Sequence, residues 1–154
     1  MTELPVIVLP VGSDLYAVPI EWVREVVAAP LTTALATSPP LVLGLINLRG
    51  EIVPLLDTAV LLGLGTIAGA AFAAVLDTGH GPAGLATTGL PQRAVLGAPT
   101  GPSELPGTAG TYQLARSVAV LLDPAALLSP ARLGAQDLSS LAKEAGAQPA
   151  EARR

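Results

Sequence analysis

One pattern occurs twice in this sequence: an apolar strand that ends at an aspartate and continues into a short leucine-rich helix. The first copy is Val-Pro-Leu-Leu-Asp-Thr-Ala-Val-Leu-Leu at residues 53–62, and the second is Ala-Val-Leu-Leu-Asp-Pro-Ala-Ala-Leu-Leu at residues 119–128. Aspartate favours the N-cap position because its carboxylate accepts the free N–H groups of the first helical turn. We therefore expect Asp57 and Asp123 to begin the two helices, with Pro124 at the first helical position, where a missing N–H has no cost.

The repeat predicts two similar small β-barrels. Their approximate extents are residues 1–65 and 66–130, and the chain is expected to cross between them in the glycine-rich segment 63–69. Farther on, apolar residues at helical spacing predict a C-terminal helix at 135–145. The last residues, 147–154, are expected to form a flexible tail beyond a single domain that ends near residue 146.

Short apolar runs separated by Gly, Pro, Ser and Asp indicate that most of the chain is β-structure. The turn signals predict hairpins with strands at 6–11 and 15–20, 43–48 and 51–56, 72–76 and 84–87, and 112–115 and 118–122. A turn of helix is expected at 21–23, followed by a strand at 24–27. The Pro- and Gly-rich segment 98–110 is expected to be a loop.

Composition excludes several classes of function. The sequence has no cysteine, which excludes disulfides, thiolate metal sites and cysteine nucleophiles. Aromatic residues make up 3% and the net charge is −4, so neither base stacking nor a basic phosphate-binding stripe is expected, and nucleic acid is not an expected partner. Glu3 occupies a region where a secretory signal carries Lys or Arg, so export is not expected.

One uncharged segment, 58–76, is long enough to be considered as a membrane span. Asp57 and Asp77 flank it, and no Lys, Arg, Trp or Tyr anchors its ends. It also contains several glycines and weakly hydrophobic alanines. We therefore read it as a helix, a loop and a strand in succession, without membrane insertion.

The stretch from Gly44 to Asp57 contains a strongly polar run in an otherwise apolar region. If it is read as continuous strand, successive side chains point to opposite faces. One face would then carry Leu45, Asn47, Arg49 and Glu51, and the other Ile46, Leu48 and Ile52. An Arg and a Glu held rigidly in this way suit recognition of another protein better than chemistry on a small molecule.

Three groups that could suggest catalysis or a cofactor have simpler explanations. Asp57 and Asp123 might be taken for a carboxylate pair, but the N-cap role explains each of them. His80 is the only histidine and lies in a glycine-rich turn, whereas a metal site needs several ligands at suitable spacing. Gly63-Leu-Gly65 lacks the remaining glycine pattern of a dinucleotide-binding turn. No catalytic residue, metal or cofactor is expected.

With this order of elements, the chain resembles the CheW-like domain of bacterial chemotaxis coupling proteins. The resemblance is strongest over residues 6–64, through Tyr16-Ala-Val-Pro-Ile20, Val23-Arg-Glu-Val26, Gly44-Leu-Ile-Asn-Leu-Arg-Gly50 and Ile52-Val-Pro-Leu-Leu-Asp57. Asn-Leu-Arg-Gly is a specific signal in that setting. The second half fits more loosely, and Thr87-Thr88-Gly89-Leu90 stands where the family usually has an Asp before a further apolar residue.

This resemblance implies two SH3-like five-stranded β-barrels packed across a shared hydrophobic core, with short helices and a C-terminal helix. It also implies a non-catalytic adaptor that couples chemoreceptors to a CheA-type histidine kinase. The expected partners are the regulatory domain of the kinase and the cytoplasmic tip of a receptor. The expected location is the cytoplasm, in association with receptor arrays. A small β-barrel enzyme or ligand-binding protein remains the alternative.

Six residues are candidates for partner binding: Val23, Glu25, Gly44, Asn47, Arg49 and Gly50. The planar guanidinium of Arg49 suits a carboxylate or backbone carbonyls of a partner, but Arg49 could instead pair with Glu51 or brace the Pro39-Pro40 loop. Val23 and Glu25 could flank a receptor-binding groove between the halves, or be a core valine and an exposed acid beside Arg24. The two glycines are expected to serve backbone conformation, with an indirect link to binding.

Overall fold

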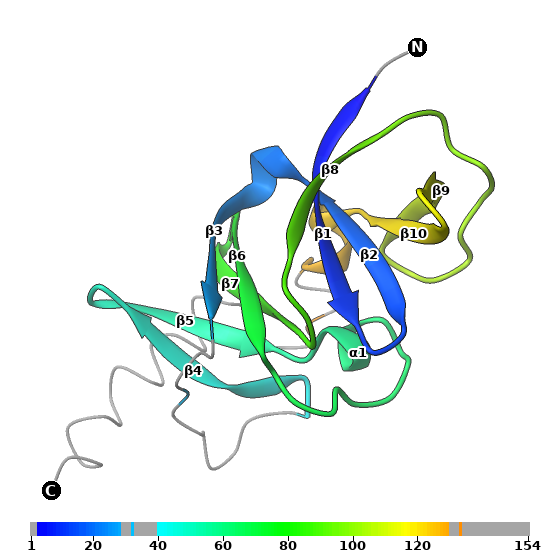
Figure 1. Ribbon diagram of the computed structural model, residues 1–154. Helices are drawn as coiled ribbons and strands as arrows, with labels where there is room; N and C mark the ends of the chain where they lie inside the picture. The colour runs from blue at the N-terminus through cyan, green and yellow to red at the C-terminus, as the bar shows by residue number, and fades with distance from the viewer. Residues whose placement is uncertain (1–2, 29–31, 33–39, 130–132, 134–154) are drawn as a thin grey trace, which may run out of the picture.

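The computed structural model describes residues 3–28, 32, 40–129 and 133. These residues form two five-stranded sheets with three short helical segments (Figure 1). The expectation of a mainly β protein with two five-stranded, SH3-like units is confirmed. The expected C-terminal helix at 135–145 and the tail at 147–154 lie outside the described residues.

The first sheet has the strand order β8-β1-β2-β10-β9. Its strands are β1 (Leu4–Val11), β2 (Asp14–Pro19), β8 (Gln92–Leu96), β9 (Thr108–Leu114) and β10 (Ser117–Leu122). Four of these strands match expected ones. The fifth, β8, was not predicted, because only one of its residues is fully buried and its sequence shows no apolar alternation.

The second sheet has the strand order β3-β6-β7-β5-β4. Its strands are β3 (Val23–Ala28), β4 (Val42–Leu48), β5 (Glu51–Leu56), β6 (Phe72–Thr78) and β7 (Gly81–Thr87). A 3-10 helix, η1 (Ile20–Trp22), leads from β2 into β3, and the helices α1 (Thr58–Leu61) and α2 (Pro124–Leu127) follow β5 and β10.

Each sheet combines a hairpin from one half of the sequence with three strands from the other half. The β1–β2 hairpin joins β10 through parallel pairing of Leu15 with Ala119, and the β6–β7 hairpin joins β5 through parallel pairing of Leu55 with Gly84. The sheets therefore do not coincide with residues 1–65 and 66–130. The expected crossing at 63–69 is wrong, because β5 and β6 belong to the same sheet; the chain changes sheets at η1 and again between β7 and β8.

The expectation that the whole segment 98–110 is a loop is wrong in part. β9 begins at Thr108, and Gly101 forms an isolated bridge with Thr111. The pairing was not predicted because the Pro and Gly residues of this segment indicate a loop. The segment 58–76 contains α1, a connection and the first part of β6. Among the described residues, no helix is long and apolar enough to cross a membrane.

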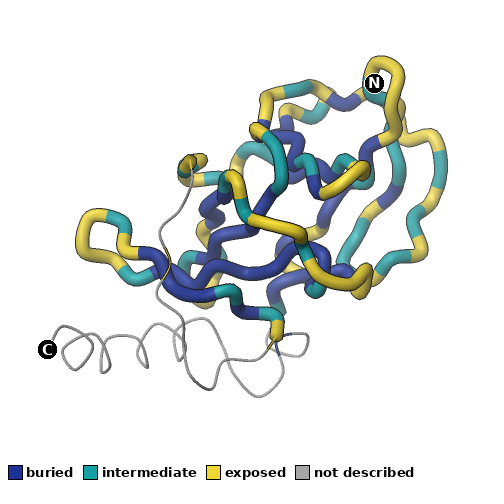
Figure 2. Tube along the Cα trace, turned by 60° about the horizontal axis from the view of Figure 1, so that its bottom comes forward, coloured by how far each residue is buried: buried dark blue, intermediate teal, exposed yellow. Residues whose placement is uncertain are grey.

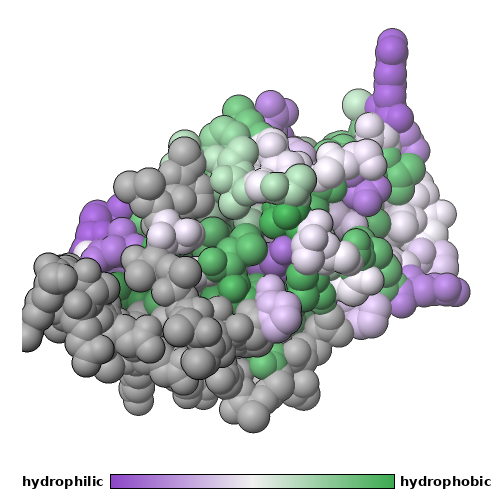
Figure 3. Space-filling model, turned by 90° about the horizontal axis from the view of Figure 1, so that it is seen from below, coloured by the Kyte–Doolittle hydropathy of each residue, from purple (hydrophilic) through white to green (hydrophobic). Residues whose placement is uncertain are grey.

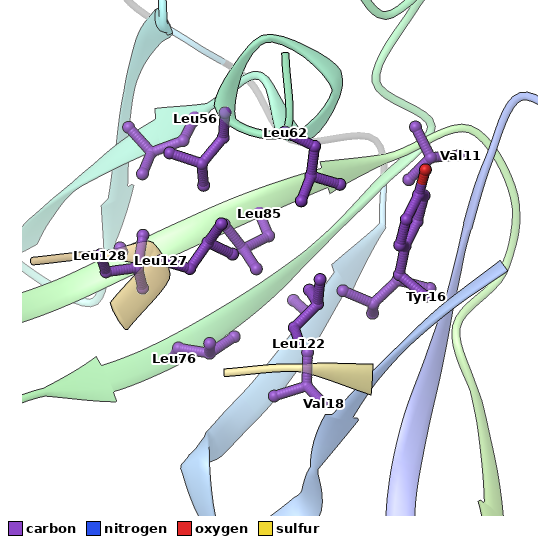
Figure 4. Packing of buried hydrophobic residues seen from close by; sticks show 14 of the residues in the cluster. Val11, Tyr16, Val18, Leu56, Leu62, Leu76, Leu85, Leu122, Leu127 and Leu128 are labelled. Atoms are coloured by element: carbon purple, nitrogen blue, oxygen red, sulfur yellow. The ribbon is translucent and has the colours of Figure 1, made fainter. Parts of the chain in front are cut away.

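A shared hydrophobic core lies between the two sheets (Figure 4). Strands from both sheets and both short helices contribute to it: Leu9, Tyr16, Val18, Leu56, Leu62, Leu76, Leu85, Leu122, Leu127 and Leu128 are all nearly or fully buried there. Each sheet also has a smaller cluster of buried residues, around Val6 and Leu96 in the first sheet and around Val53 and Val75 in the second. Buried residues accordingly run through the middle of the molecule, and exposed ones gather at the turns (Figure 2).

Both aspartates of the repeat cap their helices as expected. The Asp57 side chain is 1% exposed and accepts hydrogen bonds from the N–H groups of Ala59 and Val60, at 3.0 and 3.1 Å. It also accepts the N–H of Ile67, at 3.0 Å, and so ties the segment after α1 to the end of β5. Asp123 is exposed and accepts one N–H, from Ala126, at 3.3 Å.

We predict that Asp57→Ala destabilises the protein more than Asp123→Ala does. Asp57→Ala leaves three backbone N–H groups without their acceptor in a buried setting, which should lower the free energy of unfolding by at least about 2 kcal/mol. Asp123→Ala removes a single exposed cap and should cost about 0.5–1 kcal/mol. Urea unfolding of both variants measures the difference. Equal losses would contradict the role given to the Ile67 contact.

Candidate partner-binding site

The β4–β5 turn presents Arg49 and Gly50 at the exposed end of a hairpin whose strands are otherwise mostly buried (Figure 2). Both residues have positive φ, 52° for Arg49 and 90° for Gly50, as a two-residue type I′ hairpin turn requires. The side-chain oxygen of Asn47 accepts the N–H of Gly50 at 2.8 Å and fixes the turn. Gly50 thus serves the backbone conformation, as expected.

The expected strand face, with Arg49 between Asn47 and Glu51, is wrong. Because Arg49 and Gly50 form the turn, Leu48 pairs with Glu51 and Asn47 pairs with Ile52. Cross-strand pairs share a face, so Glu51 lies on the face of Leu48, and Ile52 lies on the face of Leu45 and Asn47. Because two residues form the turn, Glu51 and Ile52 each lie on the opposite face from the one that a continuous strand would give them.

The guanidinium of Arg49 forms a two-pronged ion pair with the carboxylate of Glu25 on β3. One pair of atoms, Nη1 and Oε1, lies 3.3 Å apart, and Nη2 donates to Oε2 in a second contact. The Arg49 side chain is 73% exposed and that of Glu25 is 26% exposed. Of the alternatives for Arg49, pairing with Glu51 is therefore wrong, since its acidic partner is Glu25. The other alternative, that Arg49 braces the Pro39-Pro40 loop, concerns a loop that lies partly outside the described residues.

A second ion-pair cluster, which was not predicted, lies beside the first. Arg24 donates to Asp77 on β6, with Nε and Oδ2 at 3.2 Å, and also to Glu51 at the start of β5. The two clusters connect β3, at one edge of the sheet, with the β4–β5 hairpin, at the other edge. Figure 3 shows hydrophilic side chains gathered at the end of this hairpin.

The charges in these clusters shift pKa values in the directions that ion pairing dictates. Hydrogen bonding from Arg49 lowers the pKa of Glu25, and the positive charges of Arg49 and Arg24 add to this effect. Hydrogen bonds to Asp77 and Glu51 raise the pKa of Arg24. Glu25 and Arg24 are therefore held in their charged forms.

The other two candidates differ in their relation to this site. Val23 begins β3, is half-buried, and packs against the shared core, so it is not a fully buried core valine. A bulge separates it from Glu25. Gly44 is buried beside a bulge in β4, with φ 157°, and pairs with Leu55. It lies at the far end of the hairpin from Arg49, so the structure does not bring it to the ion pair.

Comparison with known proteins shows the family of the chain. A family model described as the CheW-like domain matches residues 5–132. The chain belongs to the CheW-like domain family. A search of curated protein sequences finds no match to the chain.

The fold of this CheW-like chain is similar to a crystal structure of the scaffolding protein TtCheW from Thermoanaerobacter tengcongensis. The TM-score is 0.72 at 20% identity, and the match covers 84% of this chain and 90% of the other. The CheW-like family consists of non-catalytic adaptors in chemotaxis signalling, and this chain is a chemotaxis adaptor of that kind. Among the described residues, no group of three His, Asp or Glu could hold a metal ion.

Thr88, the residue after β7, links the two sheets through hydrogen bonds. The Thr88 hydroxyl accepts the N–H of Gly12 in the β1–β2 turn at 2.9 Å, and the Thr88 N–H donates to the carbonyl of Pro10 at 2.9 Å. Thr88 therefore fastens the end of β7 in one sheet to the first hairpin of the other. The side chain needed at this position is a hydrogen-bond acceptor, and a threonine hydroxyl supplies it.

We predict that the carboxyl group of Glu25 titrates below the usual range for glutamate, which is about 4.3. Because its pKa is lowered in the folded state, the pairing contributes to stability above the unfolded-state pKa and is lost as the pH falls through the folded-state pKa. Arg49→Gln should raise the midpoint toward the usual value. The measurement is an NMR titration of the side-chain carboxyl carbon, and an unchanged midpoint in the variant would contradict the pairing.

Proposed function

We propose that this chain couples chemoreceptors to a CheA-type histidine kinase by binding both at once. The regulatory domain of the kinase and the cytoplasmic tip of a receptor are the two partners. An adaptor of this kind works by raising the effective concentration of one partner near the other, and it needs no chemistry of its own. The proposal places it in the cytoplasm, in association with receptor arrays.

The observation that carries the proposal is the Glu25–Arg49 pair on a strained turn. A non-glycine residue at positive φ is uncommon, and glycine or asparagine would fit this position better. Ala115 has the same φ in the β9–β10 turn, so the feature that sets Arg49 apart is the ion pair that fixes its guanidinium. The turn and the ion pair together hold the Arg49 guanidinium at a fixed place, while most of its surface stays exposed.

The geometry of the pair suits recognition of a partner. Arginine has five N–H donors in a planar arrangement, and the pair with Glu25 uses only some of them. The remaining donors have no other acceptor among the described residues, so they can bind a carboxylate or backbone carbonyls of a partner. Because Glu25 has already ordered the side chain, binding costs less conformational entropy than it would for a mobile arginine.

The six candidate residues divide between contact and support in this proposal. Arg49 and Glu25 contact a partner directly, and Asn47 and Gly50 hold the turn that presents Arg49. Val23, half-buried beside Glu25, flanks the receptor-binding groove. Gly44 acts indirectly, through the shape of β4 at its bulge.

We predict that Arg49→Ala weakens binding to the kinase regulatory domain or to the receptor tip by at least about tenfold, because it removes a pre-ordered charged contact. Arg116→Ala provides a matched control, since Arg116 is also an exposed arginine in a two-residue hairpin turn, between β9 and β10, where Ala115 has the same φ of 52° as Arg49. Titration calorimetry with each partner, alongside a melting curve, measures both effects.

A charge exchange separates a contact role from a purely structural one. In the double variant Glu25→Arg/Arg49→Glu, the ion pair can form again, but the charge presented on the turn is reversed. We expect the double variant to fold like the parent protein and still to lose binding. Full binding by the double variant, or unchanged affinity of Arg49→Ala for both partners, would show that the pair only supports the fold.

A further inference from the structure

A pocket of about 260 Å³ opens between the first hairpin and the segment around α1. It is lined by Val11, Gly12, Ser13, Asp14, Tyr16, Ala59, Leu64, Thr66, Ile67, Ala68 and Thr88. These residues come from the β1–β2 hairpin, from α1 and its connection to β6, and from the residue that follows β7. The pocket lies beside the β1–β2 turn, far across the molecule from the β4–β5 turn (Figure 1).

The lining of this pocket includes Tyr16, whose side chain ends in a buried hydroxyl group. Tyr16 is 2% exposed, and within the part of the chain that the structure describes its hydroxyl makes no hydrogen bond. Figure 4 shows the hydroxyl beside Val11, pointing away from the leucines of the shared core. Buried hydroxyl groups nearly always have a partner, because leaving one unsatisfied is costly. The Tyr16 hydroxyl is therefore available to a group that enters the pocket.

The lining favours a positively charged group with an apolar stem. Asp14 is exposed at the mouth and is the only charged residue of the lining. Burial of the ring, and then the negative charge of Asp14, raise the pKa of Tyr16. The oxygen of the neutral phenol can accept a hydrogen bond. Val11, Ala59, Leu64 and Ile67 supply apolar walls, and Leu64 is 47% exposed at the rim although it is a large hydrophobic residue.

The size of the pocket limits what it can hold. Sites for drug-sized molecules usually measure about 300–1,000 Å³, so this one is small for a whole ligand. It is large enough for one long side chain, whose methylene groups would contact the apolar walls while its charged end reaches Asp14 and the Tyr16 hydroxyl.

We propose that this pocket receives an arginine or lysine side chain from a protein partner. It would be a second contact surface, separate from the Glu25–Arg49 pair and independent of the function proposed for that pair. Thr88 contributes both to the wall of the pocket and to the anchoring of the β1–β2 turn, because its hydroxyl accepts the N–H of Gly12.

Two short peptides test the proposal by NMR on the full chain labelled with ¹⁵N. The first is acetyl-Gly-Arg-Gly-amide, and the second carries citrulline, a neutral group of nearly the same shape, in place of arginine. We expect the arginine peptide to shift the amide signals of Gly12, Ser13 and Thr88 in a saturable manner, and the citrulline peptide to bind at least about threefold more weakly.

Asp14→Asn, on the exposed turn, should reduce the response to the arginine peptide to that of the citrulline peptide. Tyr16→Phe should weaken binding of both peptides, and a melting curve will show whether the fold is kept. Arg49→Ala should leave all these shifts unchanged, which separates this site from the proposed adaptor site. Equal responses to the two peptides, no response to either, or an unchanged response in Asp14→Asn would each overturn the proposal.

Discussion

Two parallel strand pairings hold this molecule together. β2 pairs with β10, and β5 pairs with β7, so that each sheet is completed by a hairpin from the other half of the sequence. In element order the chain is a repeat, with β1–β5 followed by β6–β10, and each sheet has the same arrangement of equivalent strands. The shared core follows from this exchange, because the chain passes from one sheet to the other at η1 and again between β7 and β8.

The two copies of the repeat differ in the contacts that their equivalent residues make. Asp57 is buried and binds three backbone N–H groups, whereas Asp123 is exposed and binds one. The equivalent hairpin turns differ as well: Arg49 in the first turn is paired with Glu25, whereas Ala115 occupies the same backbone conformation in the second. Within the part of the chain that the structure describes, this symmetrical scaffold thus carries an ion-paired arginine turn on only one of its two sheets.

Local features of the fold could be predicted from the sequence, and long-range ones could not. The hairpin strands, the capping aspartates and the turn at Gly50 depend on residues close together in the chain. The partner of β10, the edge strand β8 and the sheet to which β6 belongs depend on pairing between distant segments, which periodicity does not report. At the candidate site, Arg49 was named from the sequence as a candidate contact residue, but its ion-pair partner was not predicted. Glu25 lies in β3, and only the curvature of the second sheet brings β3 to the β4–β5 turn.

The exchange of hairpins also determines when the protein can fold during synthesis. The first sheet needs β10, which ends at Leu122, and the second needs β7, which ends at Thr87. The first hairpin therefore leaves the ribosome long before the strand that completes its sheet exists. Contacts between such distant segments slow folding, because a long loop must close before they form. Until then, the β1–β2 hairpin exposes an open strand edge, and such edges favour mispairing with other chains.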